Sequence, residues 1–322
     1  MVEERARAGS RASSDWLRKC RDAAGEVRGK TFVRLMEMLV ESVLLYGAEV
    51  WGGGSQLEPV ERVQMRAPRI FLGVGRLHPL VSLQYELMMP LRWEGRKRFI
   101  EFWIKVMRMD KERLMKVVML EALEMGGKVK WVQNLEESLR MFGWGGMSSE
   151  ALEGLSMGEV KKVLTEVAWR EVRGVWRQEA QRHPKLHLIG RLMEKECEGH
   201  GMMVKSKMRR RKLVKLRGGT AELAIETGRW RGLRREERIS KNCSGGEVED
   251  VGHLLMRCTY VEEERGKLKE LMSERVEGWQ DMHDNDRVVA VVDRACGDEA
   301  VGRAVERVWL KRFTARRHHP ST

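Results

Sequence analysis

The chain has 322 residues, of which 61 are Lys or Arg and 48 are Asp or Glu, giving a formal charge of +13. A charged fraction of 34% beside 42% hydrophobic residues and only 6 prolines excludes a disordered chain and is typical of a helix-rich globular protein. The excess of positive charge favours an acidic polymer as a partner, and nucleic acid is the first candidate.

Membrane and secreted classes are disfavoured by the apolar runs and the cysteines. The longest apolar stretch, Met38 to Ala48, is interrupted by Glu41 and is too short to span a bilayer, and no apolar segment follows the first ten residues. The five cysteines lie at irregular spacings and predict no disulfide framework. We therefore expect an intracellular protein without a membrane partner, in the nucleus or the cytoplasm.

Apolar residues recur at intervals of three and four along most of the first half, which predicts amphipathic helices. The first helix is expected from Thr31 to Tyr46, and any helical continuation of it is expected to end at the glycines at 52–54. The second, Val60 to Phe71, contains Pro68, where we expect a kink or a break. Further helices are predicted at Trp93–Met109, Lys111–Met125 and Met157–Arg182. The predicted fold class is mainly α.

Positive charge is concentrated between Lys205 and Arg238, where thirteen basic residues meet four acidic ones. Such a segment favours contact with phosphates over a merely solvated helix face. Its portion Met208 to Leu213 is also a candidate nuclear import signal. The predicted phosphate contacts are Lys205, Lys207, Arg209, Arg210, Arg211, Lys212, Lys215 and Arg217, and Trp230 between Arg229 and Arg231 is a candidate for stacking on a base.

Cys243, His253 and Cys258 form one candidate metal site, for zinc. A structural zinc site needs four ligands, and the position three residues before Cys243 carries Ser240, a poor zinc ligand. Water, the distant Cys197 or His200, or no metal at all are the alternatives for the fourth position. The acidic residues Glu247, Glu249 and Asp250 are expected to favour a helix that begins near His253. The interpretation that competes with a zinc site is therefore a small helix with an inert buried Cys and a partly exposed His.

No catalytic arrangement is evident. The chain has nine Asp, with none from 23 to 109 or from 111 to 249, so the first two hundred residues offer no Asp cluster for two-metal chemistry. This census predicts a protein that is not an enzyme.

Three stretches of this sequence resemble the C-terminal part of reverse transcriptases from non-LTR (LINE-type, jockey-like) retrotransposons. They are LLYGAEVWGGG at Leu44–Gly54; LEPVERVQMRAPRIFLGV at Leu57–Val74, followed by Leu87–Leu91; and Leu216–Trp230, continued by Cys243, Glu247–Cys258, Tyr260 and Arg265. The resemblance covers most of residues 30 to 270. It implies helical thumb or connection elements after a polymerase palm, and then a zinc-knuckle-like segment that touches RNA or DNA. The paired Asp of the family's polymerase signature occurs nowhere in this chain.

The resemblance therefore implies a non-catalytic, nucleic-acid-binding fragment that lacks the palm and the endonuclease. The expected partners are RNA or DNA and the missing polymerase half of a related element. The expected segments are an N-terminal segment (1–27), a thumb/connection-like region (28–125), a helical linker region (126–204), a basic and zinc-knuckle-like segment (205–275), and a C-terminal helix and tail (276–322). A helical interaction or scaffold protein, a fragment with residual polymerase activity and a decayed fragment without activity are the alternatives.

Overall fold

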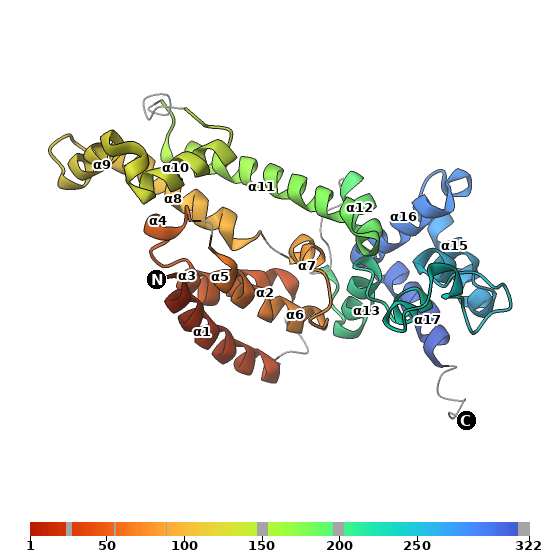
Figure 1. Ribbon diagram of the computed structural model, residues 1–322. Coiled ribbons are helices and arrows are strands. Elements are labelled where there is room, and N and C mark those ends of the chain that lie inside the picture. Colours follow the sequence, from red (N-terminus) through yellow and green to blue (C-terminus); the bar gives the residue numbers. More distant parts are fainter. Residues whose placement is uncertain (24–27, 55, 88, 147–153, 196–202, 315–322) are drawn as a thin grey trace. The chain divides into compact units, whose positions relative to one another are not determined.

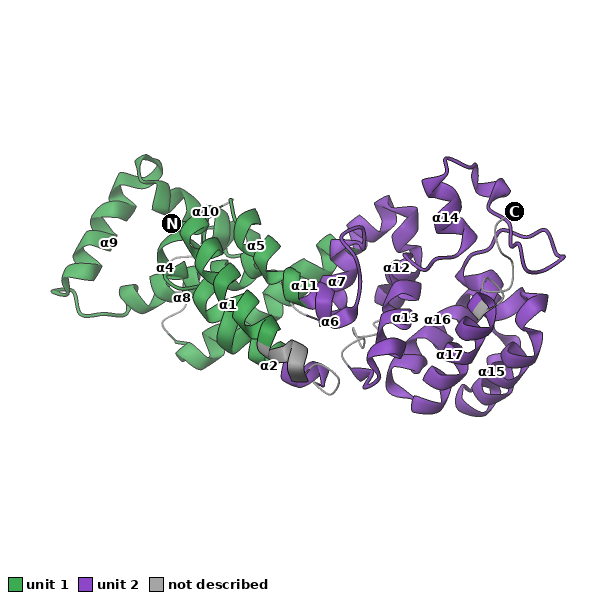
Figure 2. Cartoon of the chain, turned by 90° about the horizontal axis from the view of Figure 1, so that it is seen from below, with its two compact units in different colours: residues 1–24, 33–67, 88–176 green, residues 25–32, 68–87, 177–322 purple. Residues whose placement is uncertain are grey.

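The computed structural model describes residues 1–23, 28–54, 56–87, 89–146, 154–195 and 203–314 (Figure 1). In these ranges the chain is helices and connecting turns, and the one strand-type pairing is an antiparallel bridge between Ile239 and Val248. The mainly α class predicted from the sequence is confirmed. The contacts divide the chain into unit 1 (1–24, 33–67 and 88–176) and unit 2 (25–32, 68–87 and 177–322), coloured separately in Figure 2. The five segments expected from the sequence stay a prediction.

Unit 1 is built from helices around an apolar core that includes Met36, Leu44, Phe99 and Ile100. Its elements are α1 (Val2–Ala23), the π-helix η1 (Glu37–Glu41), α3 (Ser42–Leu44), α4 (Ala48–Trp51), α5 (Glu58–Gln64), α8 (Leu91–Met107), α9 (Leu114–Met125), the 3-10 turn η2 (Gly126–Lys128) and α10 (Lys130–Met141). Three helices contribute residues to both units: α2 (Gly29–Met36), α6 (Arg66–Leu72) and α11 (Met157–Arg182).

The glycines after Trp51 allow close packing on α8. A Cβ atom at Gly52 would meet the backbone carbonyl of Gly95, and one at Gly53 would meet the ring of Phe99. The sequence predicts these glycines as the end of a helix, and α4 does end at Trp51. The structure adds a reason for them, since a side chain at Gly52 would push α4 and α8 apart.

The break expected at Pro68 lies three residues earlier. A turn at Met65 separates α5 from α6, so Pro68 falls in the first turn of α6. The amides of a first turn have no partner within their own helix, so a proline there removes no hydrogen bond.

Unit 2 has its core between its last helices, where Leu268, Val288, Val292, Val301 and Val308 are buried. Its elements are α7 (Leu80–Leu87), η4 (Pro184–Leu186), α12 (His187–Glu194), α13 (Lys207–Arg217), α14 (Ala224–Trp230), η6 (Arg235–Glu237), the π-helix η7 (His253–Arg257), η8 (Thr259–Val261), α15 (Glu262–Arg275), η9 (Trp279–Asp281), α16 (Asp284–Gly297) and α17 (Glu299–Thr314). Helix α17 packs against both α15 and α16, and α13 packs against α7, α16 and α17. Among the described helices of both units, none has the length and apolar content needed to cross a membrane.

Candidate metal centre and nucleic-acid interface

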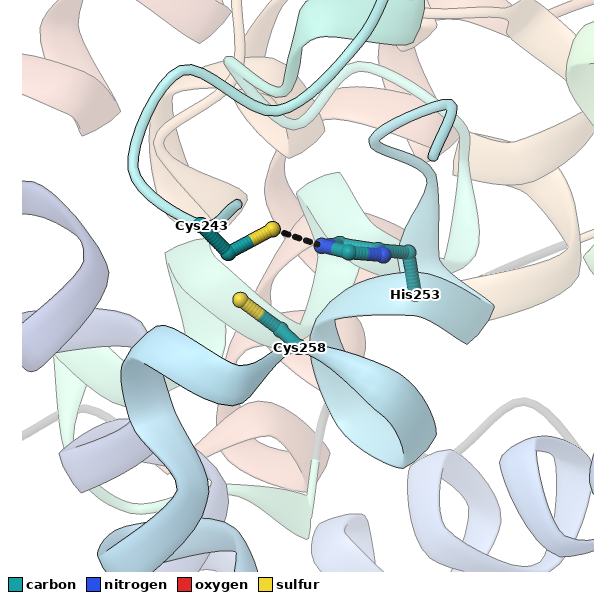
Figure 3. Close-up of side chains that lie close together, drawn as sticks. All are labelled: Cys243, His253 and Cys258. Carbon is teal, nitrogen blue, oxygen red and sulfur yellow. Dashed lines mark hydrogen bonds between the residues drawn. The ribbon is translucent and has the colours of Figure 1, made fainter. Parts of the chain in front are cut away.

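The three predicted metal ligands converge in unit 2. One ligand atom each of Cys243, His253 and Cys258 lies within 4.8 Å of the other two, and Figure 3 shows the three side chains pointing toward one another. Zinc bonds to sulfur at about 2.3 Å and to imidazole nitrogen at about 2.0 Å, so a tetrahedral site places its donors less than about 4 Å apart. The donor set and its spacing fit zinc after a small contraction of the site.

Local hydrogen bonds bring these ligands together. The amide of Ser240 donates to the carbonyl of Glu247 (3.0 Å) beside the bridge from Ile239 to Val248, which closes the loop that carries Cys243. The carboxylate of Asp250 accepts from the amide of His253 (2.8 Å) and caps the following helical turn. The capping role expected for the acidic residues is thus confirmed for Asp250. His253 is 2% exposed, so the expectation of a partly exposed histidine is wrong.

The imidazole of His253 is oriented for metal binding by Glu247. Its Nε2 lies 3.4 Å from the sulfur of Cys243, and its Nδ1 lies 3.3 Å from Oε2 of Glu247. The same carboxylate oxygen accepts from Nε of Arg257 (2.8 Å). Hydrogen bonds from Arg257 and then from His253 lower the pKa of Glu247, so it is ionised at neutral pH. An ionised acceptor at Nδ1 places the ring proton there and leaves the Nε2 lone pair free for a metal.

Cys258 directly follows η7, and its amide donates to the carbonyl of His253 (2.7 Å). The side chain is fully buried, and burial raises the pKa of its thiol, while hydrogen bonds from the amides of Tyr260 and Val261 act in the opposite direction. Amide donors stabilise a thiolate, which is the form that binds zinc. Cys197 and His200, the distant alternatives for a fourth ligand, lie outside the described residues.

The basic helix α13 is largely an interior element of unit 2. Nη1 of Arg209 lies 2.7 Å from Oε2 of Glu299, and Nζ of Lys212 lies 2.7 Å from Oε1 of Glu306. Both carboxylates belong to α17, against which α13 packs. Lys215 pairs with Glu222 at 2.8 Å.

Arg210 and Arg217 are held in the interior by other partners. Arg210 donates to the carbonyl of Val204 (3.0 Å), and its guanidinium lies 3.8 Å above the ring of Phe71. Arg217 pairs with Glu86 at 2.6 Å, and both side chains are 0% exposed. The prediction that Arg209, Arg210, Lys212 and Arg217 contact phosphates is therefore corrected, because folding encloses these four side chains. The candidate import signal at 208–213 is likewise largely enclosed.

The remaining predicted contacts are exposed, apart from the partly exposed Lys215. Lys205, Lys207 and Arg211 are exposed around the N-terminal half of α13. Trp230, at the end of α14, is 59% exposed between the exposed Arg229 and Arg231. The structure adds three exposed cations that the sequence reasoning did not single out: Arg234, Arg235 and Lys241. Arg234 and Arg235 belong to the basic segment between Lys205 and Arg238, which is the sequence signal for them, whereas Lys241 lies three residues beyond it.

The segment around Trp230 and the metal loop form one structural block. The amide of Ala224, at the start of α14, donates to the side chain of Glu249 (2.7 Å), and the amide of Ile225 donates to its carbonyl (3.0 Å). Arg312 of α17 binds the same carboxylate, with Nη2 2.7 Å from Oε2. Glu249 thus connects α14, the loop before His253 and α17, and it is fully buried.

Comparison with known proteins gave no match to a family model, a curated protein or a solved structure.

Proposed function

We propose that the chain is a non-catalytic nucleic-acid-binding module that corresponds to the C-terminal part of a non-LTR retrotransposon reverse transcriptase. The observation that carries the proposal is the exposed Trp230, flanked by Arg229 and Arg231, on the block that also assembles Cys243, His253 and Cys258. An exposed indole beside cations can stack on a base while the guanidinium groups bind phosphates. Zinc held by the three ligands would fix the neighbouring loop.

A non-catalytic role is supported by two acidic residues at the start of α16, which pair with cations. Asp286 lies 3.0 Å from Arg191 and 2.8 Å from Lys195, and Asp284 lies 3.2 Å from Arg287. In the described residues, the one group of three or more His, Cys, Asp or Glu side chains spaced to hold a metal is the Cys243 cluster. Two-metal nucleotidyl transfer needs a cluster of carboxylates instead.

The proposal is tested by fluorescence-anisotropy titration of the purified chain with labelled single-stranded RNA and duplex DNA at several salt concentrations. Loss of two phosphate contacts in Arg229→Gln/Arg231→Gln should reduce the slope of log K against log salt by about 1.4 for a single strand. Trp230→Ala should weaken binding by about 1 to 3 kcal/mol.

The matched control is Lys128→Gln/Lys130→Gln, which removes the same charge from exposed positions of unit 1. If both double variants change the slope equally, the contribution is only that of net charge and the assignment of the interface is refuted.

A second candidate, a helical interaction protein, is favoured by one observation on α9. Leu114 is 76% exposed and Val118 52% exposed, and Met115 and Met125 are exposed beside them on the same short helix. Exposed apolar groups of this size are typical of an interaction surface. A folded chain that binds nucleic acid weakly and without salt dependence would favour this candidate over the first.

A further inference from the structure

Helix α9 is apolar on almost every side, yet it buries little of this surface. Apart from Lys116 and two glutamates, all of its residues are apolar, and Met119 is its one buried residue. Nζ of Lys116 donates to the carbonyls of Met107 (2.7 Å) and Met109 (2.9 Å), which fixes α9 on the end of α8. In Figures 1 and 2, α9 stands apart from α1 and α5 of the same unit. A helix that is apolar all round is normally enclosed by other elements, and the described residues do not enclose α9.

The exposed apolar side chains form a stripe on a different side of α9 from Met119. Leu114, Val118 and Met125 lie four and seven residues apart, which places them on one side of an α-helix. All three side chains are exposed. Glu121 lies between Val118 and Met125 in the same stripe and is also exposed. The stripe is thus an apolar surface that contains one carboxylate.

The charges at the two ends of α9 have the signs that a single helix does not favour. Lys111 and Arg113 precede the helix and outnumber Glu112, whereas Glu124 lies in its last turn. Arg113 and Glu124 are both exposed, and within the described part of the chain neither has an ion-pair partner. The helix dipole favours the reverse arrangement, with acid at the N-terminus and base at the C-terminus. Two such helices that pack antiparallel place the basic end of each beside the acidic end of the other.

A single register brings the charges and the apolar stripe together. Arg113 and Glu124 are eleven residues apart, and so are Leu114 and Met125. Eleven residues make about three turns of an α-helix, so the members of each pair share one side of α9. A second copy related by a two-fold axis beside the middle of α9 therefore places its Glu124 opposite Arg113 and its Met125 opposite Leu114. Such self-complementarity is what an isologous interface requires.

We propose that α9 is a self-association surface, on which a second copy of this chain packs its own α9 antiparallel. The partner is a second copy because the stripe and the end charges of α9 complement themselves in one register. Two twelve-residue helices form a small interface, and Glu121 interrupts the stripe, so we expect a weak and reversible dimer. The inference does not depend on the metal site or on nucleic-acid binding. It names the partner of the surface that supports the second candidate function.

The experiment is sedimentation equilibrium of the full chain over a range of protein concentrations, and the wild type should follow a monomer–dimer equilibrium. Val118→Glu places a second carboxylate in the stripe and should raise the dissociation constant of the dimer by at least about tenfold. The matched control is Val175→Glu, the same change at an exposed valine of α11, which should leave this constant unchanged. Equal dissociation constants for the two variants would overturn the proposal. A wild type that stays monomeric would also overturn it and would leave the surface to a different protein.

Charge reversal tests the antiparallel arrangement. Arg113→Glu and Glu124→Arg should each weaken the dimer, because each change places like charges opposite one another. The double variant Arg113→Glu/Glu124→Arg should associate like the wild type, and so should an equimolar mixture of the two single variants, because both restore opposite charges. Equal dissociation constants for the single and the double variants would overturn the proposal. Nucleic-acid binding is scored separately by anisotropy, so failure of the dimer and failure of the proposed function are distinguishable.

Discussion

Replacement of Arg217 by Met tests whether this basic residue stabilises the interior of unit 2 and does not belong to a nucleic-acid-binding surface. Arg217 and Glu86 are both 0% exposed, their charged atoms lie 2.6 Å apart, and Nη1 of Arg217 also lies 3.2 Å from the sulfur of Cys296. Loss of the cation leaves a buried carboxylate without its counter-ion, which costs about 3 to 5 kcal/mol of unfolding free energy. For a unit of this size, the melting temperature should fall by about 6 to 20 °C.

Lys215→Met is the matched control, because it removes a cation from the same helix α13. Its partner Glu222 is 47% exposed, and an exposed pair contributes about 1 kcal/mol or less. The assay is urea unfolding followed by circular dichroism. The double variant Glu86→Leu/Arg217→Met should recover most of the lost stability, because it removes both buried charges together. A single Arg217→Met variant within about 1 kcal/mol of the wild type would refute the argument.

Two further predictions concern the metal site and a buried histidine. Glu247→Ala should weaken zinc binding by about 10- to 100-fold, because Nδ1 of His253 loses its acceptor. Zinc affinity is measured by competition with a chelator, and Glu236→Ala is the exposed control. Equal competition curves for the two variants would contradict the role of Glu247. The pKa of His78 is lowered to about 3 by burial and then by the cations Arg69, Lys185 and Lys215, whereas it is near 6.5 in the unfolded chain. The unfolded chain therefore binds a proton that the folded chain does not, so the contribution of the neutral His78 to stability is present above pH 6.5 and is lost as the pH falls. Between pH 7 and pH 5 the wild type should therefore lose about 2 kcal/mol more unfolding free energy than His78→Gln, as measured by urea unfolding at each pH. If the wild type and His78→Gln lose the same unfolding free energy, His78 is protonated freely in the folded chain.

The helices were predictable where the apolar period is long and unbroken. Helix α11 has the bounds expected from the sequence, Met157 to Arg182, and α9 ends at Met125 as expected, although it begins at Leu114 and not at Lys111. The position of the break near Pro68 was not predictable, because a proline is tolerated in a first turn and the sequence does not say where the turn begins.

The candidate metal site was predictable because its ligands are local. Cys243, His253 and Cys258 lie within sixteen consecutive residues, and Asp250 caps the turn that presents the histidine. The role of Glu247 was not evident from the sequence, since it depends on which imidazole nitrogen faces the sulfur of Cys243.

The sequence by itself predicted the helical class, the candidate metal ligands and the cluster of Arg229, Trp230 and Arg231. Only the tertiary structure decided which cations of the basic segment are available. The carboxylates that enclose Arg209 and Lys212 lie about 90 residues further along the chain, on α17, and the partner of Arg217 lies on α7. A run of Lys and Arg has the same sequence pattern whether solvent or a distant carboxylate faces it. Long-range packing sets that difference, because a buried charge needs a partner and any carboxylate that folding brings within reach can supply it.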